Sequence, residues 1–341
     1  MTNLGAAETA RILPRISPRI HSEVTTNLEA AETSRMAELE PLTECNTVLL
    51  VFDCLRFDTA RIAHTPNLDR IGRLHKAHTL ATYTPAAHFA MFAGHLPSIR
   101  EGIRVPFYHE PTKQIWRIIT APERDANKGC GILLGGTDIV DGFRRLDFFV
   151  QGIGGVSQFS TGSALRTKFD WSDFIYFGPD LNEELMKPRE AKTFPLNHID
   201  QIVSRLERQP QWFLFINNPE PHYPYDWGDG IDDEIQRDVL PRLGKVVNLR
   251  SMRPGLESVK HELLPFAPQL HAMQMKGLEA LDRKLGDLFD ELWLSSQRPV
   301  CVVGVGDHGE NFGEKYGGLE LFGHFHPTPE NVEVPLWIGT L

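Results

Sequence analysis

The sequence lacks the features that mark secreted, membrane-spanning and disulfide-rich proteins. It has only four cysteines in 341 residues, and they show neither CxxC spacing nor a dense disulfide framework. We therefore expect reduced and mostly buried thiols in a cytoplasmic protein. The clearest apolar run, residues 47–53, is far too short to cross a bilayer, and no apolar signal-peptide core begins the chain. We accordingly expect no membrane partner.

Basic charge is also scarce. The chain has 35 Lys and Arg against 45 Asp and Glu, which gives a net charge of −10 at pH 7. A protein that binds a phosphate backbone carries a basic footprint, so we expect no nucleic-acid partner. An acidic protein can still bind an anion where a metal supplies positive charge. The apolar and charged fractions, 41% and 23%, are those of an ordinary globular chain.

The N-terminal region, residues 1–42, differs from the rest because it is polar and contains a repeat. Residues 2–11 recur as residues 26–35 with eight of ten positions identical. Two copies are too few for a solenoid, which needs about three repeats to bury a core. We predict a partly ordered tail over 1–42 and a single catalytic domain over 43–341. A docking or oligomerisation arm is the alternative, which leaves a homo-oligomer open.

Beyond the tail, short apolar runs rich in β-formers alternate with helical patterns. The longest helical pattern, residues 269–294, has its Leu and Met residues near helical spacing. This alternation predicts an α/β three-layer sandwich, with a mostly parallel central sheet and helices on both faces. A glycine-rich stretch at 152–155 lacks the Lys-Ser/Thr ending of a phosphate-binding loop, so we assign it no such role. The predicted strands are residues 47–52, 131–134, 174–177, 212–216, 300–305 and 334–338.

Carboxylates and imidazoles follow three of these strands. Asp53 ends the first strand, Asp307 and His308 follow the run at 300–305, and His222 lies in the segment after 212–216. Functional sites of α/β sheets gather at the carboxyl ends of strands, so we expect these side chains to meet. Carboxylate and imidazole groups are typical metal ligands, and the sequence therefore predicts a metal site there.

Several segments, in order along the chain, resemble motifs of the alkaline phosphatase and sulfatase superfamily. The resemblance covers roughly residues 46–341 and is loose across about 100–210. It implies a sandwich of helices around a mostly parallel sheet, in agreement with the pattern of runs. The segments that carry it are residues 53–58, 65–71, 84–97, 277–286, 307–314, 323–324 and 334–338.

The resemblance implies a nucleophile and a set of metal ligands. In the family the acidic residue after the first strand and a later Asp-His pair bind metal, which assigns Asp53, Asp307 and His308. The nucleophile lies ten residues before a glycine that ends the following helix. Counting back from Gly94 gives Thr84, which we also expect to contact the metal. A helix cap without chemistry is the alternative role of this threonine.

Two further histidines match family positions, His222 in a His-x-Pro segment and His324 in a Gly-His segment. The resemblance implies that they hold substrate oxygens or bind a second metal. We favour one tightly bound ion, because Asn218 stands where two-zinc relatives place an aspartate. Glu220 could take the place of that aspartate.

A threonine hydroxyl is a weak nucleophile, and a divalent cation would lower its pKa. His308 as a ligand favours Zn²⁺ or Mn²⁺ over Ca²⁺. The stretch 84–88 lacks the Cys/Ser-x-Pro-x-Arg pattern that sulfatases convert to formylglycine. We therefore expect a metal-dependent hydrolase of a small phosphate or phosphonate ester that uses a covalent Thr84 intermediate.

Two departures from the family keep alternatives open. Ala87 replaces the usual Ser, and Cys54 stands where many sulfatases carry a second metal-binding aspartate. A non-catalytic relative that binds a phosphorylated ligand, a phosphotransferase and a sulfatase are the other readings. The roles of His88 and His326 are open between structure and support of the site. Glu310, Glu314 and Glu220 are expected to be solvated carboxylates, with support of the site as the alternative.

Overall fold

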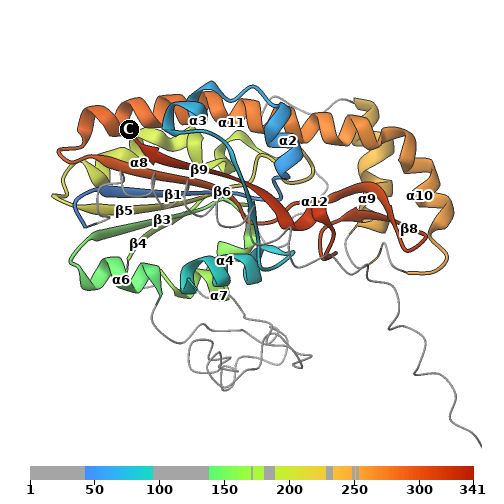
Figure 1. Cartoon of the computed structure of the whole chain (residues 1–341), viewed down its shortest axis with the longest axis horizontal. Coiled ribbons are helices and arrows are strands. Elements are labelled where there is room, and N and C mark those ends of the chain that lie inside the picture. The colour runs from blue at the N-terminus through green and yellow to red at the C-terminus, as the bar shows by residue number, and fades with distance from the viewer. Residues whose placement is uncertain are drawn as a thin grey trace, which may run out of the picture. The chain divides into compact units, whose positions relative to one another are not determined.

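The computed structural model describes most of the chain from residue 43 onward. The described residues are 43–94, 138–169, 172–179, 189–227, 233–247, 250 and 253–341 (Figure 1). The N-terminal repeat and the strand predicted at 131–134 lie outside them. None of the described helices is both long enough and apolar enough to cross a membrane.

A seven-stranded mixed sheet forms the centre of the fold. Strands β6, β1, β5, β3 and β4 run parallel. Strand β9 is antiparallel to β6, and β2 is antiparallel to β9. The mostly parallel sheet predicted from the alternating runs is confirmed. In order across the sheet the strands are β2 His75–His78, β9 Glu333–Thr340, β6 Val300–Gly306, β1 Asn46–Phe52, β5 Trp212–Asn218, β3 Phe149–Gly154 and β4 Asp173–Tyr176.

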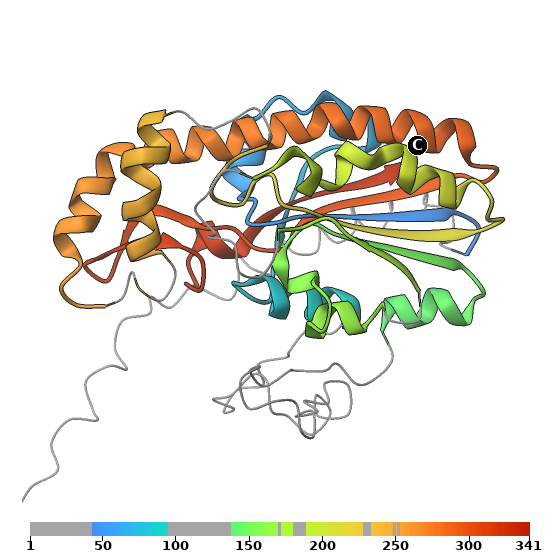
Figure 2. The ribbon, with the colours of Figure 1, turned by 180° about the vertical axis from the view of Figure 1, so that it is seen from behind.

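Helices cover both faces of this sheet (Figures 1 and 2). Alternate side chains of one strand serve the two faces, so that Leu50 of β1 joins one core cluster and Val51 the other. This accounts for the continuous apolar runs, because a strand buried on both faces needs no polar alternation. One face carries α2 Phe57–Ile62, α3 Pro66–Ile71, α8 Ile199–Leu206 and α11 Ala267–Ser295; the other carries α4 Thr84–Ala93, α6 Ile139–Arg145 and α7 Ala164–Thr167.

The long helix α11 matches the pattern predicted at 269–294. Its leucines at 270, 278, 281, 285, 288 and 292 are buried. Two polar residues, Gln274 and Asp282, are buried on the same helix. Asp282 accepts hydrogen bonds from the backbone N–H groups of Leu68, at 2.8 Å, and Asn67, at 3.1 Å, and so fixes the start of α3 against α11.

A separate sheet of two strands lies between strands β6 and β9 in the chain. It consists of β7 Asn311–Tyr316 and β8 Leu319–Gly323, and it packs with α9 Leu240–Val246 and α10 Glu257–Leu263 around a third core cluster. The sequence did not predict this hairpin. Residues 307–310 connect β6 to β7, so the predicted metal ligands Asp307 and His308 lie where the two sheets meet.

The glycine-rich stretch at 152–155 is part of strand β3 and its end. A Cβ atom on Gly152 would lie 2.4 Å from the ring of Phe174, and one on Gly154 would lie 2.5 Å from Phe159. Glycine is therefore required here for aromatic packing against the strand. This stretch therefore has a packing role in the sheet.

Candidate metal centre and nucleophile

The site lies at the carboxyl ends of three adjacent central strands, β5, β1 and β6. Asp53 follows β1, and its backbone N–H donates to the carbonyl of Asn218 at 3.0 Å. Asp307 follows β6, and its N–H donates to the carbonyl of Phe52 at 3.3 Å. These bonds continue the ladder past the strand ends, so parallel register places both carboxylates at one edge, as predicted.

Thr84 is the first residue of α4, where Tyr83 is the N-cap and its side chain makes no capping bond. The Thr84 hydroxyl is buried and lies 3.5 Å from Asp53 Oδ1 and 3.3 Å from His308 Nε2. The alternative of a simple helix cap does not describe this arrangement. The hydroxyl faces the predicted metal ligands.

The orientation of His308 is fixed by the chain itself. Its Nδ1 lies 2.9 Å from the carbonyl of Gly309, which can only accept, so Nδ1 carries the proton. The Nε2 lone pair then faces Asp307 Oδ2, at 3.5 Å, and the Thr84 hydroxyl. Burial lowers the pKa of His308 to about 4, although Asp53 opposes that shift, so the ring is neutral at physiological pH. A neutral imidazole held this way has a lone pair available for a metal ion.

Asp307 divides its two oxygens between the backbone and the site. Oδ1 accepts from the N–H groups of Cys54, at 3.0 Å, and His308, at 2.8 Å. Oδ2 is buried and accepts no hydrogen bond from any residue that the structure describes. Burial, together with the nearby Asp53 carboxylate, raises the pKa of Asp307 well above its ordinary value.

These observations test whether a cation fits. Single ligand atoms of Asp53, Asp307 and His308 all lie within 4.8 Å of one another, and all three residues are fully buried. Two buried carboxylates this close repel each other unless a cation or a proton lies between them. The donor set of two carboxylates and one neutral imidazole suits Zn²⁺ or Mn²⁺. The residues therefore fit a divalent metal.

His222 and His324 also reach this edge of the sheet. The ring of His324 lies 4.7 Å from the ring of His308 and 5.7 Å from that of His222, centroid to centroid. Burial, followed by the neighbouring His308 and His222, lowers the pKa of His324 well below its usual value. The structure thus brings together all six residues predicted from the sequence.

Cys54 contributes a contact that sequence reasoning did not assign. Its Sγ lies 3.5 Å from Nδ1 of His324 and 3.7 Å from Nδ1 of His308. It belongs to two of the three groups of described residues whose ligand atoms lie within 4.8 Å of one another. The available signal was its place directly after Asp53, at the end of strand β1.

His88 supports the site from within α4. Its Nδ1 lies 2.8 Å from the carbonyl of Thr84 and 3.6 Å from Asp307 Oδ2. The ring is packed edge-on against Phe92, Phe159 and Phe215, and burial lowers its pKa to about 4. A neutral histidine in this position orients the first turn of α4.

Gln274 of α11 also touches the backbone beneath the site. Its Nε2 donates to the carbonyls of Cys54, at 2.9 Å, and Pro221, at 3.3 Å, and to Glu310 Oε1, at 3.2 Å. From the sequence, the pattern of this helix indicated only a face packed on the core. Gln274, a polar residue among its buried leucines, was the available sign of a further role.

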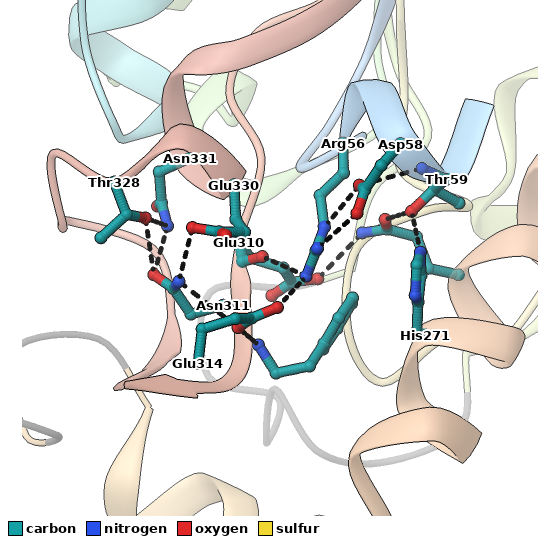
Figure 3. Close-up of polar contacts among 12 residues, drawn as sticks. Arg56, Asp58, Thr59, His271, Glu310, Asn311, Glu314, Thr328, Glu330 and Asn331 are labelled. Atoms are coloured by element: carbon teal, nitrogen blue, oxygen red, sulfur yellow. Dashed lines mark hydrogen bonds and ion pairs between the residues drawn. The ribbon is translucent and has the colours of Figure 1, made fainter. Parts of the chain in front are cut away.

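A polar network joins the site to the second sheet (Figure 3). Arg56 is buried and pairs with Asp58 and with Glu314, each at 2.6 Å, while its Nη1 also donates to the carbonyl of Glu310. Glu310 accepts from Tyr225 at 2.8 Å, and burial raises its pKa to about 8. Glu310 and Glu314 therefore support the site and are not solvated surface carboxylates.

Glu220 does not join the candidate metal ligands. It is fully buried, its carboxylate oxygens accept no hydrogen bond from the described residues, and burial raises its pKa. None of the groups of described residues that could hold a metal includes it. His326 is buried as well, but it too is outside those groups.

Comparison with known proteins gives likenesses in structure alone. No protein-family model matches the sequence, and no match is found among curated proteins. The phosphonate monoester hydrolase SpPMH from Silicibacter pomeroyi is similar with a TM-score of 0.54 and 13% identity, covering 86% of this chain and 67% of that one. The zinc complex of the C-terminal periplasmic domain of EcEptC from Escherichia coli gives 0.53 and 13%, covering 87% and 73%.

Two further structures complete the comparison. The Streptococcus pyogenes phosphoglycerol transferase GacH, in complex with sn-glycerol-1-phosphate, gives a TM-score of 0.50 and 12% identity, covering 94% of this chain and 74% of that one. A protein in the alkaline phosphatase superfamily from Vibrio parahaemolyticus gives 0.47 and 15%, and the chain spans only 60% of its length. At these identities the likeness establishes the fold. The chain has the alkaline-phosphatase-like α/β fold that its motifs predicted.

Proposed function

We propose that this protein is a metal-dependent hydrolase of a phosphate or phosphonate ester, with Thr84 as its nucleophile. One observation carries the proposal. The Thr84 hydroxyl is buried between Asp53 and His308, beside a second buried carboxylate, instead of capping its helix.

In the proposed reaction the Thr84 oxygen attacks phosphorus, a Thr84–phosphorus bond forms, and the ester oxygen leaves with a proton. Water then breaks the Thr84–phosphorus bond and restores the hydroxyl. Asp53, Asp307 and His308 would hold Zn²⁺ or Mn²⁺, which would supply Lewis acidity that lowers the pKa of the Thr84 hydroxyl and offsets charge on the phosphoryl group. His222 and His324 reach the same edge of the sheet, and their proposed role is to orient the substrate.

The class of substrate follows from the nucleophile and from the neighbours of the fold. Threonine cannot be converted to formylglycine, so an ester of phosphate or phosphonate is favoured over a sulfate ester. Proteins with this fold include a phosphonate monoester hydrolase and a phosphoglycerol transferase, so transfer to an alcohol acceptor is the second candidate. In both reactions the phosphoryl or phosphonyl group is first transferred to Thr84. Water releases it in hydrolysis, whereas an alcohol releases it in transfer.

The test is an assay panel of aryl phosphate mono- and diesters, phosphonates and sulfates, run on protein reloaded with Zn²⁺ or Mn²⁺ after chelation. Thr84→Ala should lower turnover at least ~1000-fold. Thr79→Ala is a control, since its hydroxyl bonds only locally, to the carbonyl of Ala81 at 3.1 Å. Equal turnover in Thr84→Ala and the native protein would remove Thr84 from the mechanism, and full activity after complete chelation would remove the metal.

A further inference from the structure

We propose that Gln274 is a positioning residue of the candidate metal centre, and that the Thr59 hydroxyl fixes the direction in which its amide faces. The inference rests on the proposed function only in taking the buried carboxylates and imidazole of that centre as metal ligands. It assigns control of metal affinity to a side chain of α11 that is not itself a ligand.

Gln274 joins the three segments of chain that carry the site. Its Nε2 donates to the carbonyl of Cys54 after β1, at 2.9 Å, and to the carbonyl of Pro221 after β5, at 3.3 Å. It also donates to the carboxylate of Glu310 after β6, at 3.2 Å. Each acceptor stands one or two residues from a predicted metal ligand or substrate histidine. One buried amide therefore ties together the ends of three adjacent strands.

Helix α11 comes close enough for these bonds because Gly277 has no side chain. A Cβ atom on Gly277 would lie 2.7 Å from the carbonyl oxygen of Glu220, in the segment after β5. A larger residue would therefore push the helix away from the strand ends. Gly277 and Gln274 are three residues apart, so they lie on the same face of the helix.

The amide of Gln274 can face in one direction only. Two of the acceptors at Nε2 are backbone carbonyls, which cannot donate, so the NH₂ end must face the site. The Oε1 end accepts from the Thr59 hydroxyl at 2.7 Å. Because that proton is committed to Gln274, His271 Nε2, 2.8 Å from Thr59 Oγ1, is the donor in its own bond (Figure 3). A chain of hydrogen bonds thus leads from partly exposed His271 to the site.

The backbone that Gln274 holds is a strained one. Cys54 has a φ of 62°, a left-handed conformation that is uncommon for a residue other than glycine. Its carbonyl accepts from Gln274, and its N–H donates to Asp307 Oδ1 at 3.0 Å. Strain of this kind persists where the surroundings fix the residue. Cys54 directly follows Asp53 and bonds Asp307, so its backbone helps to set the separation of the two carboxylates.

This arrangement has a consequence for metal affinity. Two buried carboxylates repel each other before a cation binds, and a scaffold that already holds them in place spares part of the cost of binding. Without the Gln274 bond, the metal would have to organise the Cys54 backbone as it binds. Removing a residue that hydrogen-bonds a metal ligand typically weakens metal affinity ~10–100-fold. Gln274 acts through one further contact, so we expect a loss near the lower end of that range.

The experiment measures the Zn²⁺ dissociation constant of chelated full-length protein by competition with a chromophoric chelator. Gln274→Met keeps the length of the side chain and removes its hydrogen bonds, so it should weaken Zn²⁺ binding ~10-fold. Thr59→Val removes the hydroxyl that orients the amide and should weaken binding by a smaller factor. Thr59→Ser keeps the hydroxyl and should bind Zn²⁺ as the native protein does.

Asp282→Asn is the matched control, because Asp282 is also a buried polar residue of α11 but bonds the start of α3. Its Zn²⁺ affinity should be native. If Gln274 only stabilises the fold, Gln274→Met and Thr59→Val should melt at lower temperature but bind Zn²⁺ with native affinity, and that result would overturn the inference. If Gln274→Met does not fold, equal affinities of Thr59→Val and Thr59→Ser would overturn it.

The same measurements separate this inference from the proposed function. Native Zn²⁺ affinity in both variants, with normal ester hydrolysis by the native protein, would remove the role of Gln274 and leave the proposed function standing. Weakened affinity in both variants, with no ester cleaved by the native protein, would remove the proposed function and leave the role of Gln274 standing.

Discussion

Replacing Asp307 by Asn should stabilise the metal-free protein and destabilise the metal-loaded protein. The substitution keeps the shape of the side chain, and Asn Oδ1 can still accept from the N–H groups of Cys54 and His308. What changes is the atom at the Oδ2 position, which accepts no hydrogen bond from the described residues. An amide there removes one of two neighbouring negative charges.

The magnitude follows from the distance. Ligand atoms of Asp53 and Asp307 lie within 4.8 Å of each other. At an effective dielectric constant of ~20, two unit charges at that separation repel by at least about 3 kcal/mol. Asp307 avoids part of this cost by holding a proton, because burial and Asp53 raise its pKa. The metal-free native protein should therefore lose stability as the pH rises through that pKa. The Asp307→Asn variant should not show this loss, because its amide does not ionise.

The assay is thermal unfolding at alkaline pH, with chelator and with saturating Zn²⁺. With chelator, Asp307→Asn should melt on the order of 5 °C above the native protein, given ~2–4 °C per kcal/mol for domains of ~150–250 residues. With metal at ~1000 times its dissociation constant, the native protein should gain about 4 kcal/mol and the variant much less. The order of the two melting temperatures should reverse.

Asp282→Asn is the matched control. Asp282 is buried and also accepts two backbone N–H bonds, from Asn67 and Leu68, but it lies on α11 away from the candidate ligands. Its substitution should shift the melting temperature by the same amount with and without metal. The reasoning is refuted if Asp307→Asn destabilises the chelated protein, or if Zn²⁺ stabilises it as much as the native protein.

Three further predictions concern packing and the surrounding network. Gly152→Ala should cost about 1–3 kcal/mol in urea unfolding, because a Cβ would lie 2.4 Å from Phe174; no loss would mean that the ring moves freely. Arg56→Ala should cost about 3 kcal/mol, since it breaks two pairs of a buried guanidinium, whereas Arg70→Ala, in a surface pair, should cost ~1 kcal/mol or less; equal losses would contradict this. For Glu310, whose pKa burial raises to about 8, the stability of chelated protein should fall as pH rises from the unfolded value of ~4.3 towards 8 and then level off. Glu310→Gln should flatten that slope in urea midpoints measured across the range, and an unchanged slope would exclude Glu310 as its source.

The central strands could be predicted because burial on both faces leaves a continuous apolar run, as in β1 and β6. Strand β2 could not, since its residues, His-Lys-Ala-His, form no apolar run and are partly or fully exposed. Strand β3 was hidden by its glycines, whose requirement comes from Phe174 and Phe159 elsewhere in the chain. The hairpin of β7 and β8 has a charged pair, Lys315 and Glu320, close to its Gly317–Gly318 turn, and it depends on a separate core.

The predicted site residues converge because parallel strands bring their carboxyl ends to one edge, a rule that sequence order alone can use. The roles of Cys54 and Gln274 could not be read in the same way. The sulfur is aimed by a left-handed backbone held by Asp307 and Gln274, and that geometry exists only in the folded chain. Metal count and substrate likewise depend on contacts that no spacing reveals.

The most direct test of the proposed function is mass spectrometry of metal-loaded protein, acid-quenched during turnover of an aryl phosphate ester. A phosphorylated threonine is stable in acid, so the covalent intermediate can be located by peptide fragmentation. We predict a phosphoryl group on Thr84, absent from chelated protein and from Thr84→Ala. Turnover with no phosphoryl group on Thr84, or with the group on another residue, would contradict Thr84 as the nucleophile.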